Sequence, residues 1–236
     1  MDWVINNVEI FIFGLVFFLF FCAVGYAIYQ AKKRHDALAA MAPRMGFDFK
    51  PRDDSFRDSH SHLKMFSRGH SHRMTNVMEG VRDGIRVLLG DYHYTTGSGK
   101  NSSAHNQTIC IITDPELKLP NFYLRREFSF LDYLGKLFGG QDINFKEDEK
   151  FSSAFVLQGT VEAETRSLFN SAVRNEFVKF AGQNIQVEGQ DDSVIVHLSL
   201  TLEPEKWSAL LKDAFAIYRA LKIATVACKT DNLDCL

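Results

Sequence analysis

Two histidine pairs carry the most unusual side-chain chemistry of this 236-residue sequence, His60-Ser61-His62 and His70-Ser71-His72. Residues two apart in an extended chain point to the same side, so each pair can offer two imidazoles to one ion. Zinc and copper accept such ligands. His60, His62, His70 and His72 are therefore a candidate Zn or Cu site, and solvated loop histidines are the simpler alternative. No other cofactor is predicted.

A second candidate is Asp91 with His93, which share one face of a predicted strand and are spaced for acid–base work. A surface Asp–His pair is the commoner explanation for this spacing. The stretch Thr96-Gly97-Ser98-Gly99-Lys100 departs from a phosphate loop, since Tyr94 and Asn101 stand where that motif needs Gly and Ser or Thr. The sequence also lacks Gly-x-Ser-x-Gly and His-Glu-x-x-His, so no catalytic residue is predicted.

These residues follow an apolar run of nineteen residues without a charge, Ile10–Ile28. At about 1.5 Å per residue a helix of this length spans roughly 30 Å, the thickness of a bilayer core. A cleaved signal peptide does not fit, because the first nine residues are acidic and Lys-Lys-Arg follows the run. A buried core helix rarely lacks polar residues over five turns. We predict one uncleaved transmembrane helix.

Charges around the run predict its orientation. Lys32, Lys33 and Arg34 follow it, whereas Asp2 and Glu9 precede it with no Lys or Arg. The positive-inside rule then places the N-terminus outside and the C-terminal domain in the cytoplasm, as a single-pass protein of the plasma (inner) membrane. Lys32, Lys33 and Arg34 are the predicted membrane-interface residues, in contact with anionic lipid.

Composition limits the classes of partner. The net charge is −2 with 24% charged residues, so no basic face points to nucleic acid. The four cysteines form no Cys-x-x-Cys pair, which suits a reducing cytoplasm. The expected partners are the lipid bilayer and either another protein or a second copy of this chain.

The pattern predicts four segments along the chain. They are an anchor and juxtamembrane helix (1–41), a polar His-rich linker (42–73), an α+β domain (74–228) and a loose tail (229–236). In the domain we predict an antiparallel sheet with amphipathic helices packed on one face. The predicted strands are 74–80, 85–95, 104–113, 121–126, 151–157, 185–188 and 194–200. The predicted helices are 130–138, 161–181 and one that starts at Pro204.

Several short motifs resemble a loosely defined group of uncharacterised bacterial membrane-anchored proteins. They are Phe66-x-x-Gly69, Asn76-Val77-x-x-Gly80, Asp91-Tyr92-x-Tyr94 and Gln107-Thr108, and the stretch from Phe151 to Phe169 is similar too. The resemblance covers residues 60–180. It implies one or two N-terminal membrane helices before a cytoplasmic domain of unknown function, and it implies no activity.

The first functional hypothesis is a membrane-tethered cytoplasmic interaction or scaffold domain without catalytic activity, since tethering raises the effective concentration of weak partners. A His-rich metal-binding protein is the alternative. An enzyme on a lipid or lipid-linked substrate, with Asp91 and His93 in a cleft near the bilayer, is the third.

Overall fold

A single antiparallel sheet of eight strands organises the domain, as seen in a computed structural model that describes residues 2–127 and 142–233. The spatial order is β1-β2-β3-β4-β8-β7-β5-β6, and every neighbouring pair is antiparallel. The strands are β1 (Asp48–Asp53), β2 (His70–Arg82), β3 (Ile85–Thr96), β4 (Ser103–Thr113), β5 (Leu119–Arg126), β6 (Phe155–Gly159), β7 (Gln186–Asp191) and β8 (Ser193–His197). The predicted α+β class is confirmed.

Alternation along the central strands divides the core into two layers, because successive side chains point to opposite faces. Val87 and Leu89 of β3 belong to the larger core on one face, whereas Leu88, Tyr92 and Tyr94 belong to the smaller core on the other. The same alternation continues in β4 and β8. Both faces of the sheet are therefore covered.

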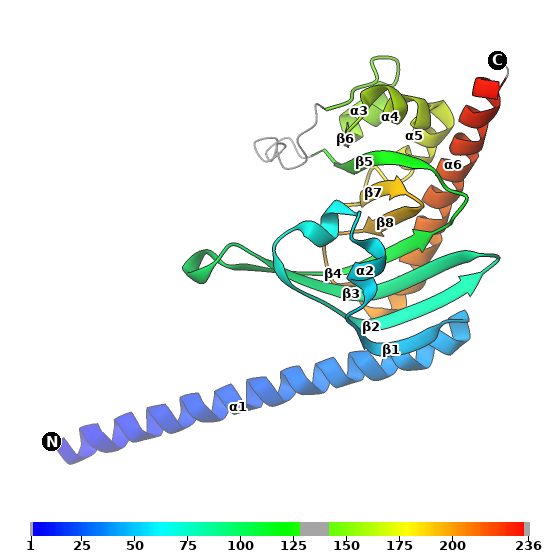
Figure 1. Ribbon diagram of the computed structural model, residues 1–236. Coiled ribbons are helices and arrows are strands. Elements are labelled where there is room, and N and C mark those ends of the chain that lie inside the picture. The colour runs from blue at the N-terminus through cyan, green and yellow to red at the C-terminus, as the bar shows by residue number, and fades with distance from the viewer. Residues whose placement is uncertain (1, 128–141, 234–236) are drawn as a thin grey trace.

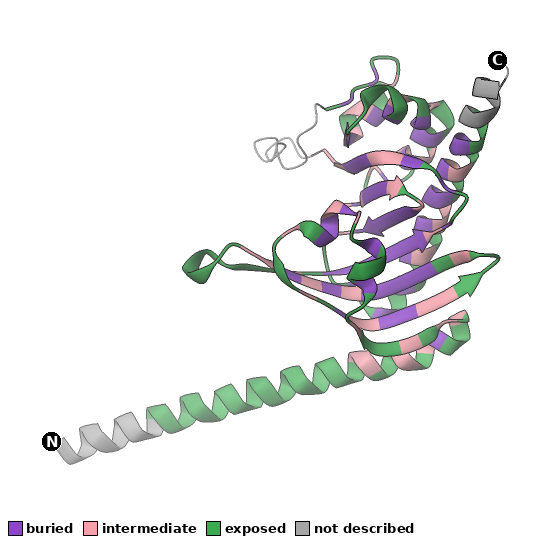
Figure 2. Cartoon of the chain, in the orientation of Figure 1, coloured by how far each residue is buried: buried purple, intermediate pink, exposed green. Residues whose placement is uncertain are grey.

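Different helices cover the two faces (Figure 1). The long helix α6 (Trp207–Leu233) crosses behind β4 and β8. The helices α4 (Glu162–Leu168) and α5 (Ser171–Val178) pack on α6, and α4 also contacts β5 and β6. On the opposite face lie α2 (Phe56–His60) and the short 3-10 helix η2 (Lys64–Ser67), which bury Phe56, Met65 and Phe66. The purple interior of Figure 2 lies between these layers.

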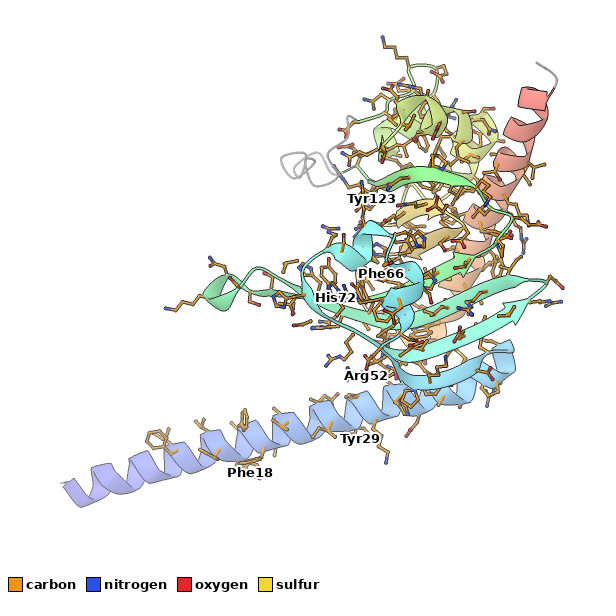
Figure 3. The ribbon with its side chains drawn as sticks, in the orientation of Figure 1. Phe18, Tyr29, Arg52, Phe66, His72 and Tyr123 are labelled. Carbon is orange, nitrogen blue, oxygen red and sulfur yellow. The ribbon has the colours of Figure 1, made fainter. Side chains whose placement is uncertain are left out.

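The first helix, α1 (Asp2–Met41), leaves the domain as a straight rod and carries the predicted apolar run. It is long and apolar enough to cross a membrane, with a segment of mean hydropathy 2.3 of which 0% is buried. Figure 3 shows Phe18 and Tyr29 pointing away from the domain, and both are exposed. The last turns behave differently, because Leu38 and Ala42 are fully buried in the larger core.

The segment 42–73 is not a linker, which corrects the prediction from its polar composition. The 3-10 helix η1 (Ala42–Met45) ends at Gly46, whose φ of 79° reverses the chain into β1. β1 then pairs with β2, and α2 and η2 pack onto the sheet. A few spaced apolar residues, Phe56, Leu63 and Phe66, are enough to hold this polar stretch in the fold.

Two other elements differ from the predictions. The predicted strand 151–157 begins with the helix α3 (Glu149–Ala154), because Asp148 caps it by accepting a hydrogen bond of 3.1 Å from the Phe151 N–H. The predicted helix 161–181 is two helices, since Asn170 accepts from the N–H groups of Ala172 and Val173 and so starts α5. The predicted helix 130–138 lies outside the described residues. α6 continues to Leu233, into the predicted tail.

Candidate functional site: the helix–sheet junction

An ion pair joins α1 to β3. The Arg34 guanidinium donates to both carboxylate oxygens of Asp91, from Nε to Oδ2 at 3.0 Å and from Nη2 to Oδ1 at 2.8 Å. The two side chains are only 19% and 14% exposed. A two-pronged, charge-assisted pair of this kind fixes both distance and angle. It holds the helix that leaves the domain against the middle of the sheet.

Asn76 extends this junction across β2. Its amide Nδ2 donates to Asp91 Oδ2 at 3.0 Å, and its Oδ1 accepts from His35 Nδ1 at 3.1 Å. The residue sits at an irregularity of β2, with a φ of 52° that Asn tolerates better than most residues. The bulge therefore turns one amide toward both α1 and β3.

Thr108 supplies the remaining hydrogen bond to the carboxylate. Its hydroxyl donates to Asp91 Oδ1 at 2.7 Å and accepts from the Leu202 N–H at 2.9 Å. Arg34 also lies over the ring of Trp207, the first residue of α6, with its guanidinium carbon 5.9 Å from the ring centroid. The junction thus ties α1, three strands and the start of α6 together.

A small cavity of about 210 Å³ opens beside the junction. Most of its lining residues are of polar type, and they come from α1, the middle of the sheet and the segment before α6. The lining residues are Ala31, Arg34, Arg73, Thr75, Asn76, Asp91, Tyr92, His93, Asn106, Gln107 and Thr201.

The predicted acid–base pair is not formed. Asp91 is occupied by Arg34, Asn76 and Thr108, whereas the Nδ1 atom of His93 lies 2.8 Å from Asn106 Oδ1. A carboxylate that already accepts four hydrogen bonds is poorly placed to take a proton from a substrate. The geometry of Asp91 fits a positioning role.

The three predicted membrane-interface residues divide into two kinds. Lys32 and Lys33 are exposed on α1, where they can meet lipid headgroups. Arg34 instead faces the sheet and belongs to the junction. The charge count of the sequence treats all three alike, and only the packing tells them apart.

The four candidate metal ligands are not brought together as one set. His60 is buried, with Nδ1 2.8 Å from the Phe56 carbonyl and Nε2 3.3 Å from the Thr113 hydroxyl. The rings of His60 and His62 are 6.5 Å apart. Among residues 12–127 and 142–227, whose side chains the structure describes, no group of three or more His, Cys, Asp and Glu is placed to hold an ion.

The second histidine pair lies at the start of β2. His70 is exposed and its Nε2 lies 3.0 Å from the Gly97 carbonyl, in the loop between β3 and β4. His72 contacts the Tyr92 hydroxyl through Nδ1 at 2.7 Å and stacks against Tyr92 and Tyr94, in the region labelled in Figure 3. Ring stacking and hydrogen bonding account for these contacts, and metal binding stays a prediction.

Two buried titratable groups on the α2 side of the sheet, Glu188 and His197, were not among the predicted site residues. Glu188 of β7 is only 4% exposed, and its carboxylate accepts from the backbone N–H groups of Lys64 and Met65. Burial raises the pKa of Glu188 to about 7. Burial lowers the pKa of His197 in β8 to about 3. The available signal was their position on strands between apolar neighbours.

Comparison with known proteins gives a distant structural likeness. No protein-family model matches the sequence, and no curated protein matches it. The crystal structure of the mycobacterial trehalose monomycolate transport factor A, TtfA, superposes with a TM-score of 0.55 over 79% of this chain and 93% of that chain. The two chains share a fold. Their sequence identity is 13%, so the likeness carries no residue roles.

The resemblance to uncharacterised membrane-anchored proteins is not tested by these comparisons and stays an expectation. The structure does add one fact to it. Asn76, Asp91 and Thr108 come from three of the quoted motifs, and all three meet in the junction.

Proposed function

We propose that this chain is a single-pass membrane protein whose domain acts as a non-catalytic adaptor, holding a protein partner or a second copy at the cytoplasmic face of the membrane. Support comes from α1, whose apolar part is exposed over a length that matches a bilayer. The structurally similar mycobacterial protein TtfA is a trehalose monomycolate transport factor. An accessory role beside a membrane transport assembly is consistent with that likeness.

The observation that carries the proposal is the junction of Arg34 with Asp91. A tethered enzyme needs only a flexible linker, which raises its local concentration near the membrane. Here α1 is continuous from its apolar part to Met41, and Arg34, Leu38 and Ala42 pack into the domain. This packing fixes the orientation of the domain relative to α1. An adaptor needs a fixed orientation in order to present one surface to a neighbouring protein.

Co-purification tests the adaptor role. The full chain with a C-terminal tag is expressed in the organism that encodes it and extracted in a mild detergent. A stoichiometric partner or a homo-oligomer is expected. Arg34→Ala should stay in the membrane yet recover several-fold less partner, whereas the neighbouring Lys33→Ala should behave as wild type. A lone monomer under gentle extraction would contradict the proposal.

Reporter fusions test the orientation. The exposed Lys32 and Lys33 beside the apolar run support a cytoplasmic domain by the positive-inside rule. A C-terminal fluorescent protein should therefore be active in a bacterial host, and a C-terminal periplasmic phosphatase should be silent. The opposite pattern would place the domain outside.

A further inference from the structure

Two stretches of this chain carry positive charge without any negative charge, although the chain is acidic overall. Residues 59–78 and 92–113 contain no Asp or Glu, yet they hold six of the eight histidines. The same stretches contain Lys64, Arg68, Arg73 and Lys100, while the net charge of the chain is −2. In the sheet these stretches lie side by side, because His70 pairs with Thr95, Arg73 with His93, and Tyr94 with His105.

This end of the sheet faces the same way as the apolar part of α1. Going forward along α1, Arg34 meets Asp91, His35 meets Asn76, and Leu38 packs in the core that includes Met78. α1 therefore runs in the direction of β2 at the junction. Going backward, toward the apolar run, leads past the start of β2 and the end of β3. Figure 1 shows the β3–β4 hairpin projecting to the side on which α1 leaves the domain.

The hairpin is long enough to reach the level of the membrane. From Asp91 to Thr96, β3 advances about 17 Å at about 3.4 Å per residue. From Arg34 back to Ile28, where the apolar run ends, α1 covers only about 9 Å. The hairpin thus reaches at least as far as the point at which the helix enters the apolar layer, so the lipid headgroups lie within its reach.

The hairpin tip is exposed, and two histidine side chains contact it. Gly97 and Gly99 have φ values of 74° and 57°, and residues 97–104 are exposed, Lys100 among them. The Gly97 carbonyl contacts His70 Nε2 at 3.0 Å, and Thr96 Oγ1 contacts His105 Nε2 at 2.9 Å. Arg73 is exposed three residues after His70 on β2, where it pairs with His93 of β3.

We infer that the β3–β4 hairpin tip, with Lys100 and the neighbouring Arg73 and His70, docks on anionic lipid headgroups as a second membrane contact of the domain. The occupant is the phosphate surface of the bilayer, because both stretches carry Lys and Arg without any Asp or Glu and the hairpin reaches the end of the apolar run. The inference rests on the membrane placement of α1 proposed above.

Hydrogen–deuterium exchange of the full chain in lipid nanodiscs tests this contact. One sample contains phosphatidylcholine alone, and the other contains phosphatidylcholine mixed with phosphatidylglycerol. Backbone amides of residues 97–104 should exchange several-fold more slowly in the anionic nanodiscs, and high salt should remove the difference. Lys100→Glu should abolish the protection. The matched control is Lys118→Glu, another exposed lysine, just past the opposite end of β4.

Each outcome separates the two proposals. Equal exchange of the hairpin in both nanodiscs, from a chain that inserts normally, would overturn the headgroup contact and leave the adaptor proposal standing. Protection that Lys100→Glu does not change would also overturn it. A chain that fails to insert into either nanodisc would overturn the membrane placement itself.

Discussion

The hydroxyl of Thr108 stands between the carboxylate of Asp91, 2.7 Å away, and the backbone N–H of Leu202, 2.9 Å away. Thr108 is fully buried in the middle of the sheet. Through this one side chain, the segment leading into α6 is connected to the residue that holds α1. The two longest helices of the chain therefore share a polar contact point inside the domain.

Replacement of Thr108 by Val should weaken this contact point. The change keeps the shape but leaves the Leu202 N–H buried without its acceptor and removes one bond from Asp91, which costs about 1–3 kcal/mol. Chemical unfolding followed by tryptophan fluorescence in detergent measures the loss. Thr108→Ser keeps the hydroxyl and should recover most of it. A Thr108→Val variant as stable as wild type would show that the two hydrogen bonds of the Thr108 hydroxyl do not contribute to stability.

Arg34→Ala should destabilise the domain because Asp91 loses its charged partner. The pair is partly exposed, so we expect a loss of about 1–3 kcal/mol, below that of a fully buried pair. Arg34→Lys should recover only part of the loss, since an ammonium cannot donate from two fixed positions. Lys33→Ala, next to it on the exposed side of α1, is the control and should change stability little.

Glu188 should give the protein a pH dependence that favours mildly acidic conditions. Burial raises its pKa from an ordinary 4.5 to about 7 in the folded state, so folding favours the protonated carboxyl. Stability should therefore fall as pH rises from about 4.5 to about 7, by roughly 3 kcal/mol. The free energy of unfolding is measured against pH for wild type and for Glu188→Gln. In the difference between the two curves, the contributions of the other titrating groups cancel. A flat difference curve would contradict the assignment.

His197 should act in the opposite direction. Burial lowers its pKa from an ordinary 6.5 to about 3, so the folded state binds fewer protons than the unfolded chain. The contribution of His197 to the free energy of unfolding should be complete above pH 6.5. Below pH 6.5 the free energy of unfolding should fall by about 1.4 kcal/mol per pH unit. His197→Asn keeps an acceptor for the Ser199 N–H, and its unfolding free energy should depend less steeply on pH in this range.

Elemental analysis should find Zn or Cu well below one equivalent in the purified chain. The ring nitrogens of His60 and His70 already contact partners within the fold, and the two histidine pairs belong to different elements. A His62→Ala, His70→Ala double variant should leave any metal content unchanged. One equivalent of metal that this variant loses would restore the histidine site.

Local sequence patterns predict most of this sheet for a physical reason. In β3 and β4 apolar side chains contribute to both cores, so the consecutive apolar residues Val87, Leu88 and Leu89 indicate a strand covered on each side. The hairpin from β2 to β3 turns at Asp83 and Gly84, both with positive φ, as turn chemistry leads one to expect.

The remaining differences depend on contacts between residues far apart in the chain. Asn170 reads as one polar residue in a helical pattern until its side chain caps α5. Likewise, Arg34 reads as a topology signal, because nothing near it in sequence reveals that Asp91 lies 57 positions away across the fold. The order in which β8, β7 and β5 follow β4 is also a tertiary property.

α1 is one unbroken helix from the apolar run to Met41. The number of residues between the apolar run and Arg34 therefore determines how far the domain lies from the membrane and how it is rotated about the helix axis. One residue inserted between Ile28 and Arg34 would turn the domain by about 100° around the helix and raise it by about 1.5 Å. Seven inserted residues would restore the direction almost fully while lifting the domain by about 10 Å. The length of α1, counted in residues, therefore sets both the rotation of the domain about the helix axis and its distance from the membrane.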